Sequence, residues 1–311
     1  MKVLVTGGAG FIGGNLCRHL LQQDWVSEVR VIDDLSSGHL SAIEGLDLEF
    51  REASILDVEE LNPLAADVDA IVHLAALGSV PRSVANPLAT HEANATGTLR
   101  VLEAARQNGA YVTLASSSSV YGANPAIPKV EALQTMPMSP YAVSKLATEQ
   151  YAMAYARCYD LEVLPFRFFN VFGPGQMPGH VYAAVIPVFV HAALNGVPLP
   201  VHGDGEQSRD FTYVGTVVET LAQAVRNRLT STPTNLAFGT RTTLKDLVRL
   251  IEEQLGTAVE VQYGEPRPGD VRHSQAGNDL LRSLFPNLRP VELATGLAET
   301  IAWMRRRHDD G

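Results

Sequence analysis

The sequence predicts an α/β fold, in which a doubly wound parallel sheet carries a smaller C-terminal region. Short apolar runs alternate with helical patterns through the first half of the chain, and a glycine-rich turn follows the first run. Glycine and proline then become dense between residues 173 and 205, where the alternation ends. Strands that are separated by helices build parallel sheets covered on both faces, so the first half is expected to form such a sheet.

The elements of this sheet can be assigned in chain order. Apolar runs predict buried strands at residues 3–6, 29–32, 48–51, 70–74, 111–115 and 163–167. Helical stretches between them are predicted at residues 15–22, 94–107 and 141–159. A further helix at 217–226 and a strand at 234–238 should return to the sheet. Thr243 and Asp246 form a capping box for a helix running to about residue 255, and residues 304–310 are expected to be a solvated tail.

Composition excludes several classes of protein. The 311 residues are 46% apolar and 19% charged, which argues against disorder. Lys and Arg total 24 against 34 Asp and Glu, so the formal net charge is −10. An acidic surface repels nucleic acid and anionic membranes, and neither is an expected partner.

Cysteine use and hydropathy predict a cytoplasmic protein. Cys17 and Cys158 are far apart and form no CxxC motif, so neither a disulfide framework nor a metal site is expected. The most apolar long stretch, residues 181–201, is interrupted by prolines and is expected to be a buried segment rather than a membrane span. The first apolar run is short and leads straight into glycines, so we expect no signal peptide before the first strand.

The first strand leads into a pattern typical of dinucleotide binding. In TGGAGFIG, the glycines at Gly7, Gly10 and Gly13 let the backbone approach a pyrophosphate, and the helix N-terminus supplies amide donors. Asp33 ends the second strand, where a carboxylate binds both ribose hydroxyls of adenosine and repels a 2′-phosphate. No Lys or Arg occurs at residues 34–39. The pattern therefore favours NAD over NADP.

A second pattern indicates acid–base chemistry. Tyr141 and Lys145 stand four residues apart, behind Ser139 as a helix cap and Pro140 at the first helical position, so they share one helical face. An ammonium beside a phenol stabilises the phenolate, so Lys145 is expected to lower the pKa of Tyr141. The four serines at 116–119 end the fifth strand, at the sheet edge where ligands bind in such folds.

Taken together, these motifs resemble a known family. The segments TGGAGFIG, HLAALGSV, SSSSVYG, YAVSK, RFFNVFGP and GDGEQSRDF resemble the extended short-chain dehydrogenase/reductases, and within them the NAD-dependent nucleotide-sugar epimerases and dehydratases. The resemblance covers essentially the whole chain and is strongest to bacterial UDP-N-acetylglucosamine 4-epimerases. It implies a Rossmann fold and an isomerase, a UDP-hexose 4-epimerase.

The resemblance also implies roles for individual residues. Ser117 would bind the sugar 4-OH, Tyr141 would be the base, and Lys145 would also hold the nicotinamide ribose. Residues implied to bind NAD are Gly7, Gly10, Phe11, Ile12, Gly13, Asp33, Ser36, Ser54, Ile55, Leu74, Ala75, Ala76, Tyr141, Lys145 and Phe168. Residues implied to bind the UDP-sugar are Ser79, Arg82, Ser117, Ser118, Ser119, Tyr141, Asn170, Arg209, Arg267, Asp270 and Ser274.

In this family, Arg209 and Arg267 match the positions that grip the nucleotide diphosphate, for which guanidinium groups are suited. Asp270 would take a uridine ribose hydroxyl, and Asn170 would contact the diphosphate side. Relatives restricted to UDP-glucose and UDP-galactose carry a bulky tyrosine where this chain has Ser274, which leaves room for an N-acetyl group. We therefore expect interconversion of UDP-GlcNAc and UDP-GalNAc, with the unacetylated pair as a further substrate.

Three alternatives remain open. A sugar 4,6-dehydratase would carry Asp and Glu where this chain has Ser118 and Ser119, whose hydroxyls do no acid–base work near neutral pH. A UDP-uronic acid 4-epimerase would use Arg82 or Arg272 for the sugar carboxylate. A non-catalytic sensor that binds NAD would commonly lack the Tyr or the Lys of the YxxxK motif, and both are present.

The sequence differs from its family at two positions, and the resemblance also implies a domain organisation and a homodimer. Relatives often read adenine through an Asp where this chain has Ser54, and often have an Asp where it has Gly277. The resemblance implies a homodimer through helices at about 94–107 and 141–159. The NAD-binding domain is expected to comprise residues 1–169 plus about 212–240, and the nucleotide-sugar-binding domain about 170–211 plus 241–311.

Overall fold

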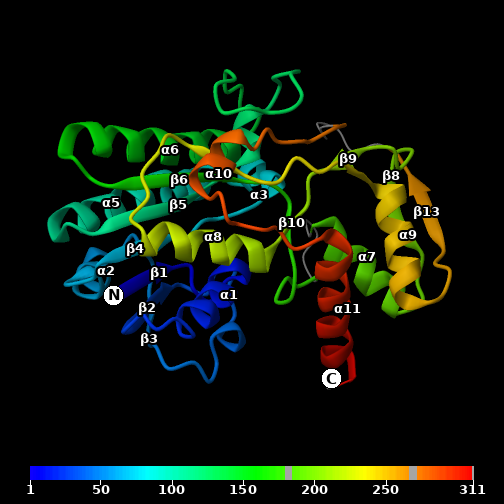
Figure 1. The fold of residues 1–311 in the computed structure, drawn as a ribbon, viewed down its shortest axis with the longest axis horizontal. Helices are drawn as coiled ribbons and strands as arrows, with labels where there is room; N and C mark the ends of the chain where they lie inside the picture. The colour runs from blue at the N-terminus through cyan, green and yellow to red at the C-terminus, as the bar shows by residue number, and fades with distance from the viewer. Residues whose placement is uncertain (179–183, 266–271, 310–311) are drawn as a thin grey trace.

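Seven parallel strands form the central sheet, in the order β11-β6-β5-β4-β1-β2-β3 (Figure 1). The computed structural model describes residues 1–178, 184–265 and 272–309. The strands are β1 (Lys2–Thr6), β2 (Glu28–Asp33), β3 (Glu49–Glu52), β4 (Ala70–His73), β5 (Tyr111–Ser117), β6 (Val163–Phe168) and β11 (Thr234–Leu236). The predicted parallel sheet is confirmed, and each predicted strand of the first half overlaps an observed one.

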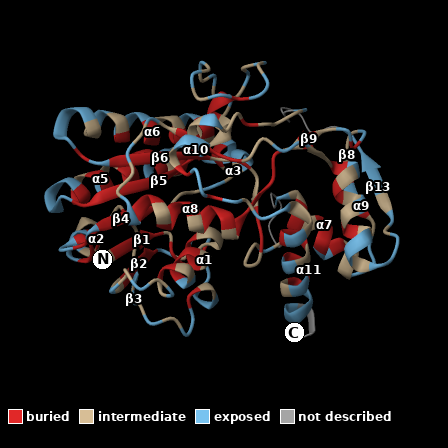
Figure 2. Cartoon of the chain, viewed as in Figure 1, coloured by how far each residue is buried: buried red, intermediate tan, exposed pale blue. Residues whose placement is uncertain are grey.

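Helices cover both faces of this sheet because its strands are apolar on both sides. Along β1, Val3 and Val5 pack into one hydrophobic cluster, and Leu4 packs into the other. Figure 2 shows the buried strands lying between the helices. The first face is covered by α1 (Phe11–Leu20) and α8 (Val214–Arg226), and the second by α2 (Val58–Ala65), α5 (Gly97–Asn108) and α6 (Pro140–Tyr159).

Short segments join these elements. They are η1 (Leu40–Ala42), α3 (Val80–Ala85), α4 (Pro87–His91), η2 (Glu92–Thr96) and η3 (Ser118–Tyr121). The helix predicted at 94–107 is thus a π-helical turn followed by α5, which ends at Gly109 in the left-handed conformation (φ 64°). The helix predicted at 15–22 begins earlier, at Phe11, because the glycine turn itself caps it.

The C-terminal region contains short paired strands and four helices in the part of the chain that is described. The strands are β7 (Val171–Phe172), β8 (Leu199–His202), β9 (Ser208–Arg209), β10 (Thr212–Tyr213), β12 (Thr242–Thr243) and β13 (Val261–Gly264). The helices are α7 (Val185–Leu194), α9 (Leu244–Leu255), α10 (Asp279–Leu284) and α11 (Leu293–Asp309). Both hydrogen bonds of the Thr243–Asp246 capping box are present at the start of α9, as predicted.

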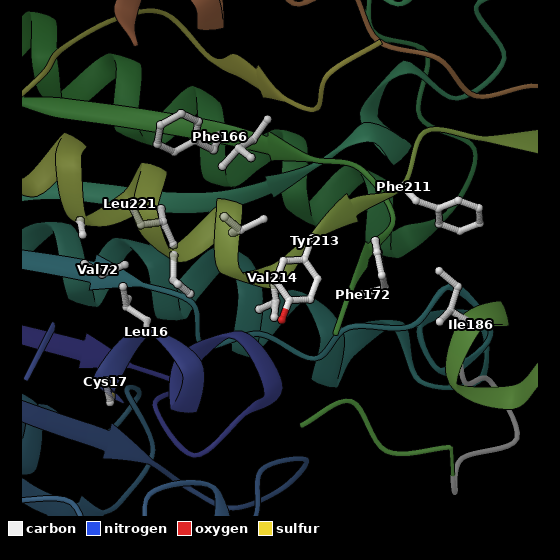
Figure 3. Packing of buried hydrophobic residues seen from close by; sticks show 14 of the residues in the cluster. Leu16, Cys17, Val72, Phe166, Phe172, Ile186, Phe211, Tyr213, Val214 and Leu221 are labelled. Carbon is white, nitrogen blue, oxygen red and sulfur yellow. The ribbon is translucent and has the colours of Figure 1, made fainter. Parts of the chain in front are cut away.

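The sheet and the C-terminal region share one hydrophobic core. Figure 3 shows Phe172, Tyr213 and Val214 lying between residues of the sheet, such as Val72 of β4, and Ile186 of α7. All of these belong to one continuous cluster of buried side chains. The C-terminal region is therefore packed firmly against the ends of the strands.

The predicted solvated tail at 304–310 is wrong. Residues 304–309 continue α11, which packs Leu297, Ile301 and Met304 into the shared core, with exposed fractions of 0%, 3% and 7%. The spacing of these three apolar residues is that of one helical face. Among the helices of the described residues, none is long and apolar enough to cross a membrane.

His73 ends β4 in a buried hydrogen-bonded position. Its Nδ1 lies 2.7 Å from Thr6 Oγ1 and its Nε2 lies 3.0 Å from Thr98 Oγ1, which itself donates to the Asn94 carbonyl. Thr98 therefore accepts from Nε2–H, and the ring is neutral. Burial, together with the charge of Lys145, lowers the pKa of His73 to about 3.

This buried imidazole should make the protein less stable in acid. In the unfolded chain His73 titrates near pH 6.5, so below that pH the unfolded state binds a proton that the folded state refuses until about pH 3. The free energy of unfolding should fall by about 1.4 kcal/mol per pH unit, or roughly 2 kcal/mol between pH 6.5 and pH 5. Urea unfolding of wild type and His73→Gln at pH 7.5 and pH 5 tests this. An equal loss of stability in both proteins would contradict it.

Candidate active site

A cavity of about 1070 Å³ opens at the carboxyl ends of β1, β2, β4 and β5. Its wall includes Gly7 after β1, Asp33 at the end of β2, Leu74 after β4 and Ser117 at the end of β5. In parallel sheets of this kind, ligands bind at that edge, beside the point where the strand order reverses. The volume lies at the upper end of the roughly 300–1,000 Å³ that is typical of ligand sites.

The glycine turn forms a cradle that side chains would fill. Gly7 has a φ of +73°, and a Cβ there would lie 2.6 Å from the Ala75 nitrogen. A Cβ on Gly13 would lie 2.2 Å from the Gly7 oxygen. Gly10 caps α1 with no side-chain hydrogen bond, so the first backbone N–H groups of the helix are open to a ligand phosphate. The cradle fits the pyrophosphate of a dinucleotide.

Asp33 lies beside this turn in a fixed orientation. Its Oδ2 accepts a hydrogen bond from the Ala9 nitrogen, and its Oδ1 accepts one from the Leu35 nitrogen, both at 2.9 Å. The carboxyl group is 8% exposed, and burial raises its pKa while the two backbone bonds oppose that change. The oxygens keep lone pairs for two ribose hydroxyls, as the sequence pattern suggested.

Tyr141 and Lys145 reach the cavity from the first turns of α6. Pro140 opens this helix, and the Ser139 side chain accepts a hydrogen bond from the Ala142 nitrogen at 3.1 Å. Both site residues line the cavity wall. Lys145 Nζ donates to the Ala115 carbonyl at 2.9 Å, and burial lowers the pKa of Lys145 to about 8.

The expected effect of Lys145 on Tyr141 is not what the structure shows. Burial raises the pKa of Tyr141 above its ordinary value, and a hydrogen bond with the Ser117 hydroxyl opposes this rise only in part. The prediction of a lowered pKa is wrong in this structure because burial of the phenol outweighs the opposing effect of the nearby Ser117 hydroxyl. The Lys145 ammonium donates to the Ala115 carbonyl of β5.

Most of the predicted residues meet in this cavity. All of those assigned to the cofactor line it: Gly7, Gly10, Phe11, Ile12, Gly13, Asp33, Ser36, Ser54, Ile55, Leu74, Ala75, Ala76, Tyr141, Lys145 and Phe168. Four of those assigned to the substrate do so as well: Ser79, Arg82, Ser117 and Tyr141. Ser118 and Ser119 instead begin η3, where Ser119 bonds the Ser117 hydroxyl through its nitrogen (3.1 Å) and its own hydroxyl (2.9 Å).

Three further substrate residues gather next to the cavity, around residues 208–210. The Asn170 side chain donates to the Asp210 carbonyl, while an Arg209 guanidinium nitrogen and the Ser274 backbone nitrogen each donate to the Ser208 carbonyl, all at 3.0 Å. Asn170 stands between the cavity residues Phe168 and Val171, so this group adjoins the wall. The remaining two predicted residues, Arg267 and Asp270, lie outside the described residues.

Some wall residues were not anticipated. Arg18 of α1, Gln176, and Trp303 with Arg307 of α11 also line the cavity. Arg307 lies over the Trp303 ring, 5.5 Å from its centroid. The helical spacing of Leu297, Ile301 and Met304 could have predicted α11. The run of arginines at 305–307 that follows suggested an exposed tail instead.

The structure also accounts for the Gly277 departure. A Cβ at this position would lie 2.6 Å from Val130 Cγ1. The Gly277 nitrogen donates to the Lys129 carbonyl at 2.7 Å, and its carbonyl accepts from the Asn235 side chain at 3.0 Å. An aspartate would therefore not fit without a shift of the Val130 segment. Ser54 does line the cavity, and its Oγ accepts from the Leu56 nitrogen at 3.3 Å.

Comparison with known proteins agrees with this geometry. Residues 3–237 match the NAD dependent epimerase/dehydratase family. The chain is 38% identical to a UDP-glucose 4-epimerase of Mycolicibacterium smegmatis, with 99% of each chain covered. It is 36% identical to the solved UDP-N-acetylglucosamine 4-epimerase of Methanobrevibacter ruminantium, with 98% of each chain covered and a TM-score of 0.93.

A UDP-glucose 4-epimerase from Thermotoga maritima, solved with UDP-glucose, is 33% identical over 99% of this chain and 100% of that one, with a TM-score of 0.92. The resemblance inferred from the sequence motifs and the choice of NAD as the cofactor are both confirmed. The protein belongs to the NAD-dependent epimerase/dehydratase family.

Proposed function

We propose that the protein is an NAD-dependent 4-epimerase of UDP-sugars that interconverts UDP-GlcNAc and UDP-GalNAc through a 4-keto intermediate. This proposal rests on one observation: Tyr141 and Ser117 line the same cavity as the glycine turn and Asp33. The predicted enzyme class is confirmed by the relatives, which are named as 4-epimerases of UDP-sugars.

The chain's own residues would handle the proton of the sugar 4-OH. Ser117 and Tyr141 present two hydroxyl groups to the same cavity, and a sugar hydroxyl placed between them would bond to both. Tyr141 would take the proton as the sugar is oxidised and return it to the opposite epimer. Lys145, fixed on the Ala115 carbonyl, would hold the nicotinamide ribose. NAD, when bound, supplies the oxidising group that accepts hydrogen from C4 and gives it back.

The residues after Ser117 favour epimerisation over dehydration. Loss of water from the sugar would need an acid and a base at positions 118 and 119, and hydroxyl groups stand there. Ser119 is moreover occupied with the Ser117 hydroxyl. The alternative of a UDP-uronic acid substrate is supported by Arg82 on the cavity wall, whereas the other candidate, Arg272, is paired with Asp204 at 2.9 Å.

The preference for acetylated sugars rests on Ser274. This small side chain adjoins Arg209 at the Ser208 carbonyl, in the group of residues beside the cavity. Arg209, Arg267, Asp270 and Asn170 would hold the UDP moiety, with guanidinium groups on the diphosphate. The similarity to a UDP-N-acetylglucosamine 4-epimerase supports the same choice.

We propose a homodimer through the helices at about 94–107 and 141–159, which correspond to α5 and α6. Val143 and Tyr151 of α6 expose 53% and 38% of their surface, and the adjoining α3 and α4 expose Val84 (65%) and Leu88 (77%). Exposed apolar side chains of this kind are typical of subunit contacts.

We also propose a cytoplasmic location, because both Cys17 and Cys158 are free thiols.

The Tyr141→Phe variant tests the chemistry. Removing the phenol oxygen should lower kcat by roughly 100- to 10,000-fold, the range for loss of a general base, while the bound NAD content stays that of wild type. NMR of a panel of UDP-hexoses, each supplied alone, gives the products, and release of the dinucleotide by heating gives its content. Full turnover by the variant would overturn the assignment of Tyr141, and a 6-deoxy-4-keto product would show a dehydratase.

The Ser274→Tyr variant tests the substrate. A tyrosine should fill the space for the N-acetyl group, so that turnover of UDP-GlcNAc is lost while that of UDP-galactose is kept. The matched control is Ser283→Tyr, on the exposed side of α10, which should leave both activities unchanged. If Ser274→Tyr loses turnover of UDP-GlcNAc and of UDP-galactose equally, Ser274 does not provide the space for the N-acetyl group. If the wild-type enzyme turns over UDP-glucuronate alone, the uronic acid alternative is favoured.

A further inference from the structure

A buried ion pair adjoins the active site at the junction of α6 with β5 and β6. Glu149 of α6 and Arg167 of β6 expose 0% and 5% of their surface. Arg167 Nε donates to Glu149 Oε1 at 2.8 Å, and Nη2 donates to Oε2 at 2.9 Å. Ser116 Oγ donates to the same Oε1 at 2.6 Å. One carboxylate therefore joins a helix to two neighbouring strands.

The hydrogen bonds of this pair continue to η3, which follows β5, and to the edge strand β11. Arg167 Nη1 donates to the Tyr121 hydroxyl at 2.8 Å, and that hydroxyl donates to Asn235 Oδ1 at 2.7 Å. Tyr121 and Asn235 are also fully buried, at 1% and 0% exposed. A buried ion pair contributes little net stability, because removing two charges from water offsets most of their attraction. Its directional hydrogen bonds, however, define how the joined elements are placed.

Three consecutive residues of β5 are each joined to the catalytic face of α6. The Ala115 carbonyl accepts from Lys145 Nζ at 2.9 Å, Ser116 donates to Glu149, and the Ser117 hydroxyl lies close to the Tyr141 phenol. Tyr141, Lys145 and Glu149 are spaced by four residues and so follow one side of the helix. Two of these three connections belong to the active site, and the third has no part in the proposed chemistry.

We propose that Glu149 is a positioning residue: held by Arg167, it fixes α6 against Ser116 so that the Tyr141 phenol meets the Ser117 hydroxyl. The inference rests on the 4-epimerase function proposed above. The Glu149 carboxylate is not part of the cavity wall, although its partner Ser116 is, so Glu149 acts only through the placement of the helix. A displacement of about 1 Å between reacting groups can cost roughly 100-fold in rate, so a small loosening of this junction should be visible in kcat.

The test removes one hydroxyl at the junction. In Ser116→Ala the Glu149–Arg167 pair stays bidentate, but its connection to β5 is lost. We expect kcat to fall roughly 10- to 100-fold, while KM for the UDP-sugar and the NAD content of the purified enzyme stay within about twofold. Thr113→Val is the matched control: Thr113 is a buried β5 residue whose hydroxyl bonds the Leu164 carbonyl of β6 at 2.9 Å, away from α6. Its kcat should equal that of wild type.

The outcomes separate this inference from the proposed function. A Ser116→Ala enzyme with the kcat of Thr113→Val, or one whose loss lies in KM or in NAD content, overturns the positioning role. A second variant, Glu149→Gln, keeps one oxygen for Ser116 but loses one of the two hydrogen bonds with Arg167. Its kcat should also fall, and a folded Glu149→Gln enzyme with wild-type kcat would overturn the proposal as well. A wild-type protein that inverts no UDP-sugar overturns the proposed function, and this inference with it.

Discussion

The parallel register of the central sheet is the constraint on which the site depends. Because β1, β2, β4 and β5 run the same way and pair in register, their carboxyl ends meet at one edge. That edge places the glycine turn, the Asp33 carboxylate and the Ser117 hydroxyl along a single cavity. Residues that are more than a hundred positions apart in the chain are brought together in this way.

Helix α6 is the second requirement, since it carries the groups that face the sheet edge. Its start is set locally by Ser139 and Pro140, but its placement depends on side chains of β5 and β6. The Lys145 ammonium on the Ala115 carbonyl and the Glu149 carboxylate between Ser116 and Arg167 are both buried. Such polar contacts are costly to bury and gain little stability, so their value lies in the geometry that they enforce.

The fold and most of the cofactor site could be predicted from sequence because the signals are local. The glycine spacing, Asp33 at a strand end, and the four-residue interval between Tyr141 and Lys145 each reflect one strand end or one helical turn. Features that depend on long-range packing were missed: Trp303 and Arg307 reach the cavity only because α11 packs on the shared core. The pKa of Tyr141 was misjudged for a similar reason, since it is raised by burial of the phenol, which depends on how the chain packs around it.

The central claim is that hydrogen leaves C4 of a UDP-sugar and returns to the same carbon within one site. The most direct measurement is proton NMR of the product formed from UDP-GlcNAc that carries deuterium at C4. The product should be UDP-GalNAc in which C4 keeps its deuterium, because neither solvent nor a second substrate takes part in the transfer. Exchange of that deuterium for solvent hydrogen, or the absence of any epimer, would contradict it.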